Sequence, residues 1–322
     1  MTIYADSLGF LFSQAELINK TGLQIDPKIR LDLCHITAAP PFKTSVAEIE
    51  EECRFIHKVL EDQGVVVVRN RKDLARDNLK VVLGLQHPPL DATVTDLQRL
   101  RSLGVLFCTL AYEGENPFGG GFATPDISLS VGGKKFLRNL AEAYMILDLS
   151  HAGHQTARDT LAEILNYCIP IGVVATHTGA YSVFNHLRNL PDDILQGIKY
   201  FQGFVGVTTC TFLNHASDNS LQPFCAHIRH VVGVIGSQFV TIGSDGVYKT
   251  LKVNEDQERF ELMKNLIDPR GNFHARYPDQ PFSLNMAYRM KRIHIELQEQ
   301  WTKRIVERLL GENFFNYVAA HI

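Results

Sequence analysis

Short apolar runs alternate with amphipathic segments along most of the chain. Two of the runs, Met145 to Leu149 and Ile171 to Ala175, flank the segment from Gln155 to Tyr167. Each run is too continuous for a half-exposed strand and favours a strand of a parallel sheet that is buried on both faces. The segment between them carries apolar side chains on one face and charged ones largely on the others, which is typical of an amphipathic helix. This stretch therefore predicts a β-α-β unit.

The same alternation over the rest of the chain predicts a barrel. Apolar runs of strand length lie near residues 31, 65, 80, 105, 145, 171, 204 and 239, and helical segments separate most of them. Eight β/α repeats over roughly 220 residues match a (β/α)8 TIM barrel, which is an α/β fold. We expect residues 1–28 to form a short preface of helix and loop. From about residue 255 we expect a helical extension of the same single domain, 1–322.

Two capping signals predict helix boundaries. Ser45 is followed three residues later by Glu48, a capping box that predicts a helix over residues 45–63. Near the end of the chain, the pattern from Arg289 to Leu310 indicates one long amphipathic helix, and Gly311 is the type of residue that ends a helix.

The composition excludes several classes of protein. The chain has 322 residues, of which 45% are hydrophobic and 21% charged, and its net charge is −3. This composition is typical of a globular domain without a nucleic-acid or anionic-membrane surface. No window approaches the roughly 18 apolar residues of a membrane span, and the first residues lack the pattern of a signal peptide. The six cysteines are scattered without a CxxC pair, so we expect a reduced, cytoplasmic protein.

Four side chains with metal-binding chemistry stand where predicted strands end. His35 follows the first strand, His151 the fifth, His177 the sixth and Asp245 the eighth. The carboxyl ends of the strands of a parallel barrel share one rim, where catalytic groups gather. A single histidine after a strand is more often a loop residue bonded to backbone, but three imidazoles and one carboxylate together suit a divalent ion. The set predicts a metal site at this rim, with Asp245 beside it as a proton shuttle.

Several segments also carry a family pattern in a fixed order. They are DLSHAG, ATHTGAYSV, RNLPDD, HIRHVVGVIGSQFVTIGSDG and GENFFNYV. Together they resemble the two histidine strands, the arginine segment, the final helix and strand and the closing motif of the membrane (renal) dipeptidases, peptidase family M19. The resemblance covers most of the chain from about residue 30 and is densest from 145 to 250. It implies a TIM barrel of the metallo-dependent hydrolase type that holds two zinc ions and hydrolyses dipeptides.

The resemblance implies roles for individual residues. It implies that His151 and His177 bind one metal ion, and that Asp245 is a ligand and proton shuttle near the other. Arg188 matches the family's clamp for the substrate carboxylate, a role that suits the planar fork of a guanidinium; an ordinary ion pair at a helix start is the alternative. Tyr112 falls where the family has a substrate-facing histidine, and its phenol either donates to an oxyanion or packs.

Two family ligands are replaced in this sequence. The family's first strand ends in His-x-Asp, whereas this chain has His35-Ile36-Thr37. The family's third strand ends in a glutamate that bridges the two metal ions, and we place Gly84 at that position. Two close cations repel each other strongly unless an anion lies between them. We therefore expect at least one metal site to be lost.

Three functional interpretations remain open. In the first, the chain hydrolyses a dipeptide or a related small amide with one zinc ion rather than two. In the second, it is a catalytically impaired homologue that binds a small carboxylate-bearing or peptide-like ligand, with or without a metal. In the third, it acts on another amide or ester. We expect a small-molecule partner, no nucleic acid and no membrane, with a homodimer left open, and weak or absent hydrolysis of ordinary dipeptides.

Overall fold

Parallel strands run through most of the chain and form one curved sheet. The computed structural model describes residues 2–40 and 42–322. Within them, eight strands follow each other in the order β1-β2-β4-β5-β6-β7-β8-β9, and β3 (Val66–Val67) pairs with β4 off this path. The eight are β1 (Ala5–Asp6), β2 (Leu33–Thr37), β4 (Lys80–Leu85), β5 (Val105–Thr109), β6 (Ile146–Asp148), β7 (Val173–Thr178), β8 (Val205–Val207) and β9 (Val240–Ile242).

The two ends of this path meet and close the barrel. The backbone N–H of Ser7, just after β1, donates to the carbonyl of Ile242 in β9 at 2.8 Å. Further along, Phe10 and Val247 form an isolated parallel bridge. The predicted (β/α)8 barrel is therefore confirmed, and all carboxyl ends of its strands open on one rim.

The first barrel strand is not where the apolar pattern placed it. β1 lies in the segment that we expected to be a preface of helix and loop, and β2, which carries His35, is the second barrel strand. The run near residue 65, predicted as a barrel strand, forms β3 outside the closed path. β1 has two residues and is made by its pairing with Leu33 and Cys34 of β2, so it has no apolar run of its own for a sequence pattern to detect.

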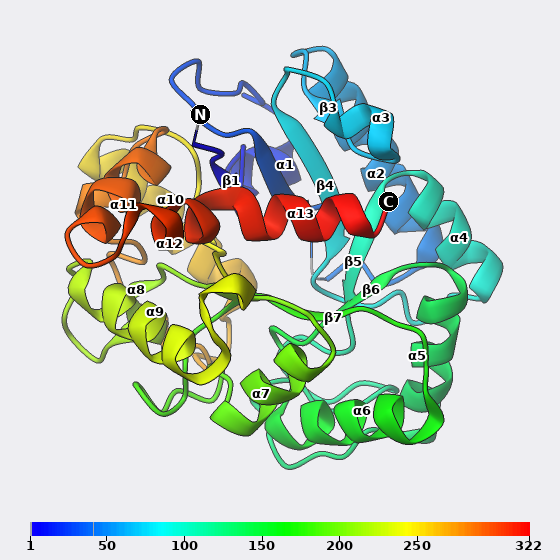
Figure 1. The fold of residues 1–322 in the computed structure, drawn as a ribbon. Helices are drawn as coiled ribbons and strands as arrows, with labels where there is room; N and C mark the ends of the chain where they lie inside the picture. Colours follow the sequence, from blue (N-terminus) through cyan, green and yellow to red (C-terminus); the bar gives the residue numbers. More distant parts are fainter. Residues whose placement is uncertain (1, 41) are drawn as a thin grey trace.

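Helices surround the barrel (Figure 1), and their buried apolar side chains join those of the strands in one core cluster. The outer helices are α2 (Val46–Glu61), α4 (Val94–Ser102), α5 (Val131–Glu142), α6 (His154–Tyr167), α7 (Asp192–Tyr200) and α9 (Gln222–Ile235). Shorter helical segments are α1 (Gln14–Asn19), α3 (Arg71–Leu74), α8 (Thr211–Asn214) and the 3-10 turns Ser237–Phe239 and Phe282–Leu284. The predicted cap of α2 is confirmed, because Ser45 Oγ accepts a hydrogen bond from the Glu48 backbone N–H. No helix in the described part of the chain is long and apolar enough to cross a membrane.

The C-terminal region is helical, as expected, but its long helix is broken. The region contains α10 (Val253–Ile267), α11 (Arg289–Gln298), α12 (Lys303–Glu307), a π-helical turn (Arg308–Glu312) and α13 (Asn313–Ala320). The prediction of one helix over residues 289–310 is wrong, because the helix ends at Gln298 and resumes at Lys303. The predicted end at Gly311 coincides with a kink, where the backbone is not helical (φ 177°, ψ −32°) and after which α13 follows. A Cβ atom on Gly311 would lie 2.5 Å from the carbonyl oxygen of Ile3, so this glycine permits close backbone contact with the N-terminal segment. The assignment of residues 1–322 to one domain stays a prediction.

The barrel interior is layered, and the layers decide which side chains reach the rim. α13 crosses the amino end of the barrel (Figure 1), where Phe314 packs 6.2 Å from Phe107, measured between ring centroids. Side chains alternate along a strand, so His35 lies one layer above Leu33 of β2, which belongs to the same interior cluster as Phe107. Thr37 lies one layer higher again and lines the cavity at the rim. A residue must therefore stand at the very end of its strand to contact a ligand.

Candidate functional site

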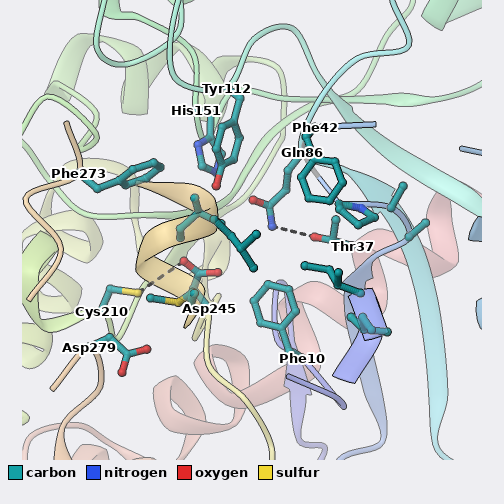
Figure 2. A pocket seen from close by; sticks show the side chains of 18 of the residues that line it. Phe10, Thr37, Phe42, Gln86, Tyr112, His151, Cys210, Asp245, Phe273 and Asp279 are labelled. Atoms are coloured by element: carbon teal, nitrogen blue, oxygen red, sulfur yellow. Dashed lines mark hydrogen bonds between the residues drawn. The ribbon is translucent and has the colours of Figure 1, made fainter. Parts of the chain in front are cut away.

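A cavity of about 90 Å³ opens at the carboxyl end of the barrel (Figure 2). The side chains that line it at or after barrel strands include Phe10, Thr37, Gln86, Tyr112, His151, Arg188 and Asp245. These include four of the six site residues predicted from the sequence. Of the other two, His177 adjoins the cavity through His151, and His35 lies deeper in the barrel.

The two histidines from neighbouring strands face each other. His151 follows β6, and His177 lies inside β7, one residue before its end. Their Nε2 atoms are 3.0 Å apart. Burial lowers the pKa of both imidazoles well below the usual value, and the nearby charge of Arg188 lowers both further. Both rings are therefore neutral near pH 7, which is the form that donates a lone pair to a metal ion or a proton.

A chain of hydrogen bonds fixes the proton positions on these rings. The Thr176 hydroxyl donates to Asp148 Oδ2 at 2.5 Å and lies 2.8 Å from His177 Nδ1. Because the hydroxyl has only one hydrogen, it accepts its second bond from Nδ1–H of His177. The bare Nε2 of His177 then accepts from Nε2–H of His151. Nδ1 of His151 then carries no hydrogen, and its lone pair has no hydrogen-bond partner among the described residues.

Arg188 is a cation buried at the same rim. Its side chain belongs to the segment after β7 and is 1% exposed. Nη2 donates to the carbonyl of His177 at 2.9 Å, and Nη1 donates to the carbonyl of Ser150. Nε has no hydrogen-bond partner, and no carboxylate lies within 4.0 Å of the guanidinium, as far as the described residues show. The predicted alternative, an ion pair at the helix start, is instead made by Arg158 with Asp193.

Asp245 lies on the cavity wall after β9. Its backbone is in the left-handed region, with φ 54°, and its N–H donates to the carbonyl of Leu8 at 2.8 Å. Oδ2 is 3.5 Å from Cys210 Sγ, which acts as a weak donor. Burial raises the pKa of the carboxyl to about 7, although the charge of Arg188 opposes the shift.

Tyr112 covers one face of His151. The ring centroids are 4.1 Å apart with an interplanar angle of 22°. Burial raises the pKa of the phenol, and the nearby Asp245 raises it further, so the hydroxyl stays protonated and can donate a hydrogen bond. Both predicted roles for Tyr112 remain compatible with this position, since the side chain packs and also lines the cavity.

His35 packs inside the barrel, where it has no opening to the cavity. Nδ1 lies 2.7 Å from the carbonyl of Ser7, and the ring lies 4.7 Å from that of Phe107. Gly84, on the adjacent strand, leaves the space that the imidazole fills: a Cβ atom there would lie 2.1 Å from Nε2. The structure therefore places His35 on the second barrel strand rather than the first and outside the residues that line the cavity, although it lies near enough to His177 to lower the pKa of that imidazole.

The residues missed by sequence reasoning include one of the cavity, Gln86, and two that support His177, Asp148 and Thr176. Gln86 follows β4 and donates through Nε2 to Thr37 Oγ1 at 2.7 Å (Figure 2). It stands two residues beyond Gly84, one full repeat of strand alternation, and is the residue at the end of the third barrel strand that lines the cavity. Asp148 and Thr176 were missed because polar residues inside apolar runs give no signal of their own. The alternation of β4 could have identified Gln86.

The donors do not fit a two-ion metal centre. Nowhere in residues 2–40 and 42–322 do three His, Cys, Asp or Glu side chains group in a way that could hold a metal ion. β1 ends in Asp6, whose carboxylate accepts hydrogen bonds from Ser244 and Tyr248 and does not line the cavity. The residues that follow are Ser7-Leu8-Gly9-Phe10 after β1 and Gln86 after β4, so neither strand end brings a carboxylate to the cavity. Catalytic zinc sites use three protein ligands. The paired Nε2 atoms of His151 and His177 are two of the donors that a single ion would need.

Comparisons with known proteins agree with the resemblance seen in the sequence. The model of a family described as membrane dipeptidase, peptidase family M19, matches residues 31–274. A relative from Schizosaccharomyces pombe, described as an uncharacterized dipeptidase, is 28% identical over 219 residues. That match covers 64% of this chain and 50% of the relative, so it spans about half of the relative's length.

Solved structures support the same fold. An amidohydrolase from Pseudomonas aeruginosa superposes with a TM-score of 0.79 at 20% identity, over 99% of this chain and 96% of that one. A metallo peptidase from Rhodobacter sphaeroides, solved with a phosphinate mimic of the dipeptide L-Ala-D-Ala, superposes with a TM-score of 0.74 at 17% identity, over 98% of each chain. At these identities the likeness shows the barrel fold and leaves the chemistry to the site itself.

Proposed function

Because the chain belongs to the membrane dipeptidase family, peptidase family M19, we propose that it binds a small amide with a free carboxylate, of about the size of a dipeptide, at the carboxyl end of its barrel. The family is one of metal-dependent hydrolases. One observation carries the proposal for this chain: Arg188 is a buried cation on the cavity wall, and in the described residues Asp245 and Asp148 act on its charge only from beyond the 4.0 Å of an ion pair.

The geometry of Arg188 suits a carboxylate ligand. A buried charge is costly unless it is paired and hydrogen-bonded, and the two carbonyl partners of Arg188 satisfy only part of its fork. Nε and Nη2 form the edge of the guanidinium that binds a carboxylate through two parallel hydrogen bonds. Nε is free of protein partners in the described structure. A ligand carboxylate there would supply the missing negative charge.

The other predicted site residues have supporting roles in this proposal. Tyr112 lines the cavity with a protonated phenol that can donate to the ligand's amide oxygen. Asp245 lies on the same wall and is the carboxyl group that could hold or accept a proton during turnover. Both roles need a bound ligand within hydrogen-bond distance, which mutation and binding data can test.

Hydrolysis with one zinc ion is the second candidate function. The 3.0 Å separation of the two Nε2 atoms favours it, since neutral imidazoles from neighbouring strands are common ligands of one ion. His151 and His177 would hold the ion, with Asp148 and Thr176 orienting His177 from behind. A bound zinc ion lowers the pKa of water and polarises a carbonyl. We propose at most one ion per chain and weak turnover of ordinary dipeptides.

Calorimetric titration with N-acetylglycine tests the binding proposal. N-acetylglycinamide, which lacks the carboxylate, is the matched ligand control and should bind far more weakly. Arg188→Lys keeps the charge but loses the fork, and should weaken N-acetylglycine binding by about tenfold to a hundredfold, the range for a hydrogen bond between charged groups. Arg229→Lys, a change of the same type on outer helix α9, should have no effect. Equal affinity of wild type and Arg188→Lys would refute the clamp.

Metal analysis separates the two candidate functions. Protein purified without added metal and then dialysed against zinc should hold at most one ion per chain, and His177→Ala should lose it. Two ions per chain would contradict our interpretation of the donor set. A panel of dipeptides, assayed with zinc, cobalt and manganese, should show weak or no turnover. Robust turnover that disappears in His177→Ala would establish the hydrolase over the binding protein.

A further inference from the structure

The cavity wall has a polar side and an apolar side. Asp245, Cys210 and Asp279 lie on one side in Figure 2, together with Phe273, whereas Phe10 and Phe42 lie on the other. The polar groups on that second side in Figure 2, Gln86 and Thr37, are hydrogen-bonded to each other at 2.7 Å. The apolar side continues through side chains of the loop after β2 and of helices α1, α2 and α10: Leu17, Ile18, Ala38, Ala39, Phe55, Ile56 and Leu266. Phe10, which follows β1, belongs to this apolar side.

The carboxylates that could hold an ammonium group are already paired. Glu52 lines the apolar side, but its Oε1 lies 3.5 Å from Lys20 Nζ and 3.1 Å from Lys43 Nζ. Asp279 lies 2.6 Å from Arg259 Nη2. A ligand ammonium beside either group would compete with a protein cation. Asp245 is the cavity carboxylate without an ion pair in the described structure, and the charge of Arg188 acts on it, which opposes a second cation there.

We propose that the cavity binds an N-acylated amino acid, whose carboxylate contacts Arg188 and whose aliphatic or aromatic acyl group lies against the apolar side. This inference rests on the proposed function, since Arg188 anchors the ligand in both. An N-acylated amino acid differs from a plain dipeptide in one respect: its terminal nitrogen is part of a neutral amide, whereas that of a dipeptide is a charged amine. A neutral, apolar group at that end matches a wall that offers it no free anion.

The cavity opens to the surface, so its walls do not set a fixed length for the acyl group. A short acyl chain lies against the apolar side chains next to the amino-acid part of the ligand. A longer chain continues past Phe42 and Leu266, which line the cavity and are 55% and 40% exposed. These two side chains therefore mark the mouth.

Calorimetric titration with glycine derivatives of increasing acyl length tests the proposal. N-hexanoylglycine should bind at least about tenfold more tightly than N-acetylglycine, because each fully buried methylene contributes about fourfold. Glycylglycine, with its charged amine, should bind more weakly than N-acetylglycine. Affinity that is independent of acyl length, or glycylglycine binding as tightly as N-hexanoylglycine, would overturn the inference.

Two leucines of α10 provide a matched pair of variants. Leu266 lines the cavity, whereas Leu262, one turn earlier, does not, and the two are 40% and 51% exposed. Leu266→Gln should reduce the preference for hexanoyl over acetyl, and Leu262→Gln should leave it unchanged; equal effects would contradict the proposed acyl position. Arg188→Lys should weaken all N-acylglycines by a similar factor while the dependence on acyl length persists. Failure of the clamp alone is therefore distinguishable from failure of the acyl assignment.

Discussion

The contact between Gly84 and His35 predicts that one added methyl group will destabilise the barrel. A Cβ atom at position 84 would lie 2.1 Å from Nε2 and 2.9 Å from Cε1 of the imidazole. The ring cannot move away at no cost, because its Nδ1 is 2.7 Å from the carbonyl of Ser7 and its face contacts Phe107. Gly84→Ala must therefore displace either the ring or the strand.

The magnitude follows from these contacts. Overpacking in a filled interior costs about 1–3 kcal/mol, and loss of the hydrogen bond between His35 and Ser7 adds about 1 kcal/mol. We expect Gly84→Ala to lower the free energy of unfolding by about 2–4 kcal/mol, measured by urea denaturation followed by circular dichroism. Gly233→Ala is a suitable control, since a Cβ atom there meets no atom within 4 Å in the described structure.

A double-mutant cycle identifies the cause. His35→Ala removes the ring that the new methyl group would strike, so Gly84→Ala should cost less than about 1 kcal/mol in that background. If the two substitutions are additive, or if Gly84→Ala alone changes stability by less than about 0.5 kcal/mol, the reasoning is wrong. Such a result would also favour the original placement of Gly84 at the position of the family's bridging glutamate.

Other buried groups give three expected outcomes. Burial raises the pKa of the Asp6 carboxyl from 3.8 to about 6, so the folded protein binds the carboxyl proton more tightly than the unfolded chain does. Protonated Asp6 therefore adds about 3 kcal/mol to the free energy of unfolding below pH ~4, and this contribution is lost as the pH rises through 6. Urea denaturation across this range should show that Asp6→Asn removes that part of the pH dependence. Thr176→Val leaves Asp148 and His177 without their shared hydroxyl and should cost about 1–3 kcal/mol in the same assay, whereas Thr176→Ser should cost less. Gln86→Glu should leave the zinc content at or below one ion per chain by atomic emission, because the loop after β1 still lacks a donor.

The architecture can be predicted from the sequence because a buried parallel strand and its covering helix both leave clear patterns. β4 and β5 lie within the predicted apolar runs, and α2 begins directly after Ser45, as its capping signal indicates. The rim positions of His151 and Asp245 follow from the same logic, since both stand after strands. These features depend on local sequence and on a barrel geometry that is common to the fold.

The features that escaped prediction depend on contacts between distant segments. β1 is a strand because it pairs with β2 and because Ser7 bonds to Ile242, and no local pattern in two residues contains that information. The interruption between Gln298 and Lys303 divides the helix predicted over residues 289–310, and the close approach of Gly311 to Ile3, about three hundred positions away in the chain, has no local signal either. The apolar run near residue 65 has the composition of a barrel strand, but its place outside the closed path is decided by the pairing of β2 directly with β4.

The position of β1 changes the interpretation of the lost metal ligands. With β2 as the first strand, Thr37 and Gly84 are two isolated replacements of carboxylates. With β1 as the first strand, the segment after it, Ser7-Leu8-Gly9-Phe10, offers no imidazole or carboxylate, and Gln86 is the neutral residue at the rim of the third strand. Phe10 belongs to that segment and also builds the apolar side of the cavity. On the proposed function, a segment that offers no metal donor at this rim therefore also forms part of the apolar wall, and a ligand held by that wall and by Arg188 would not depend on a second ion.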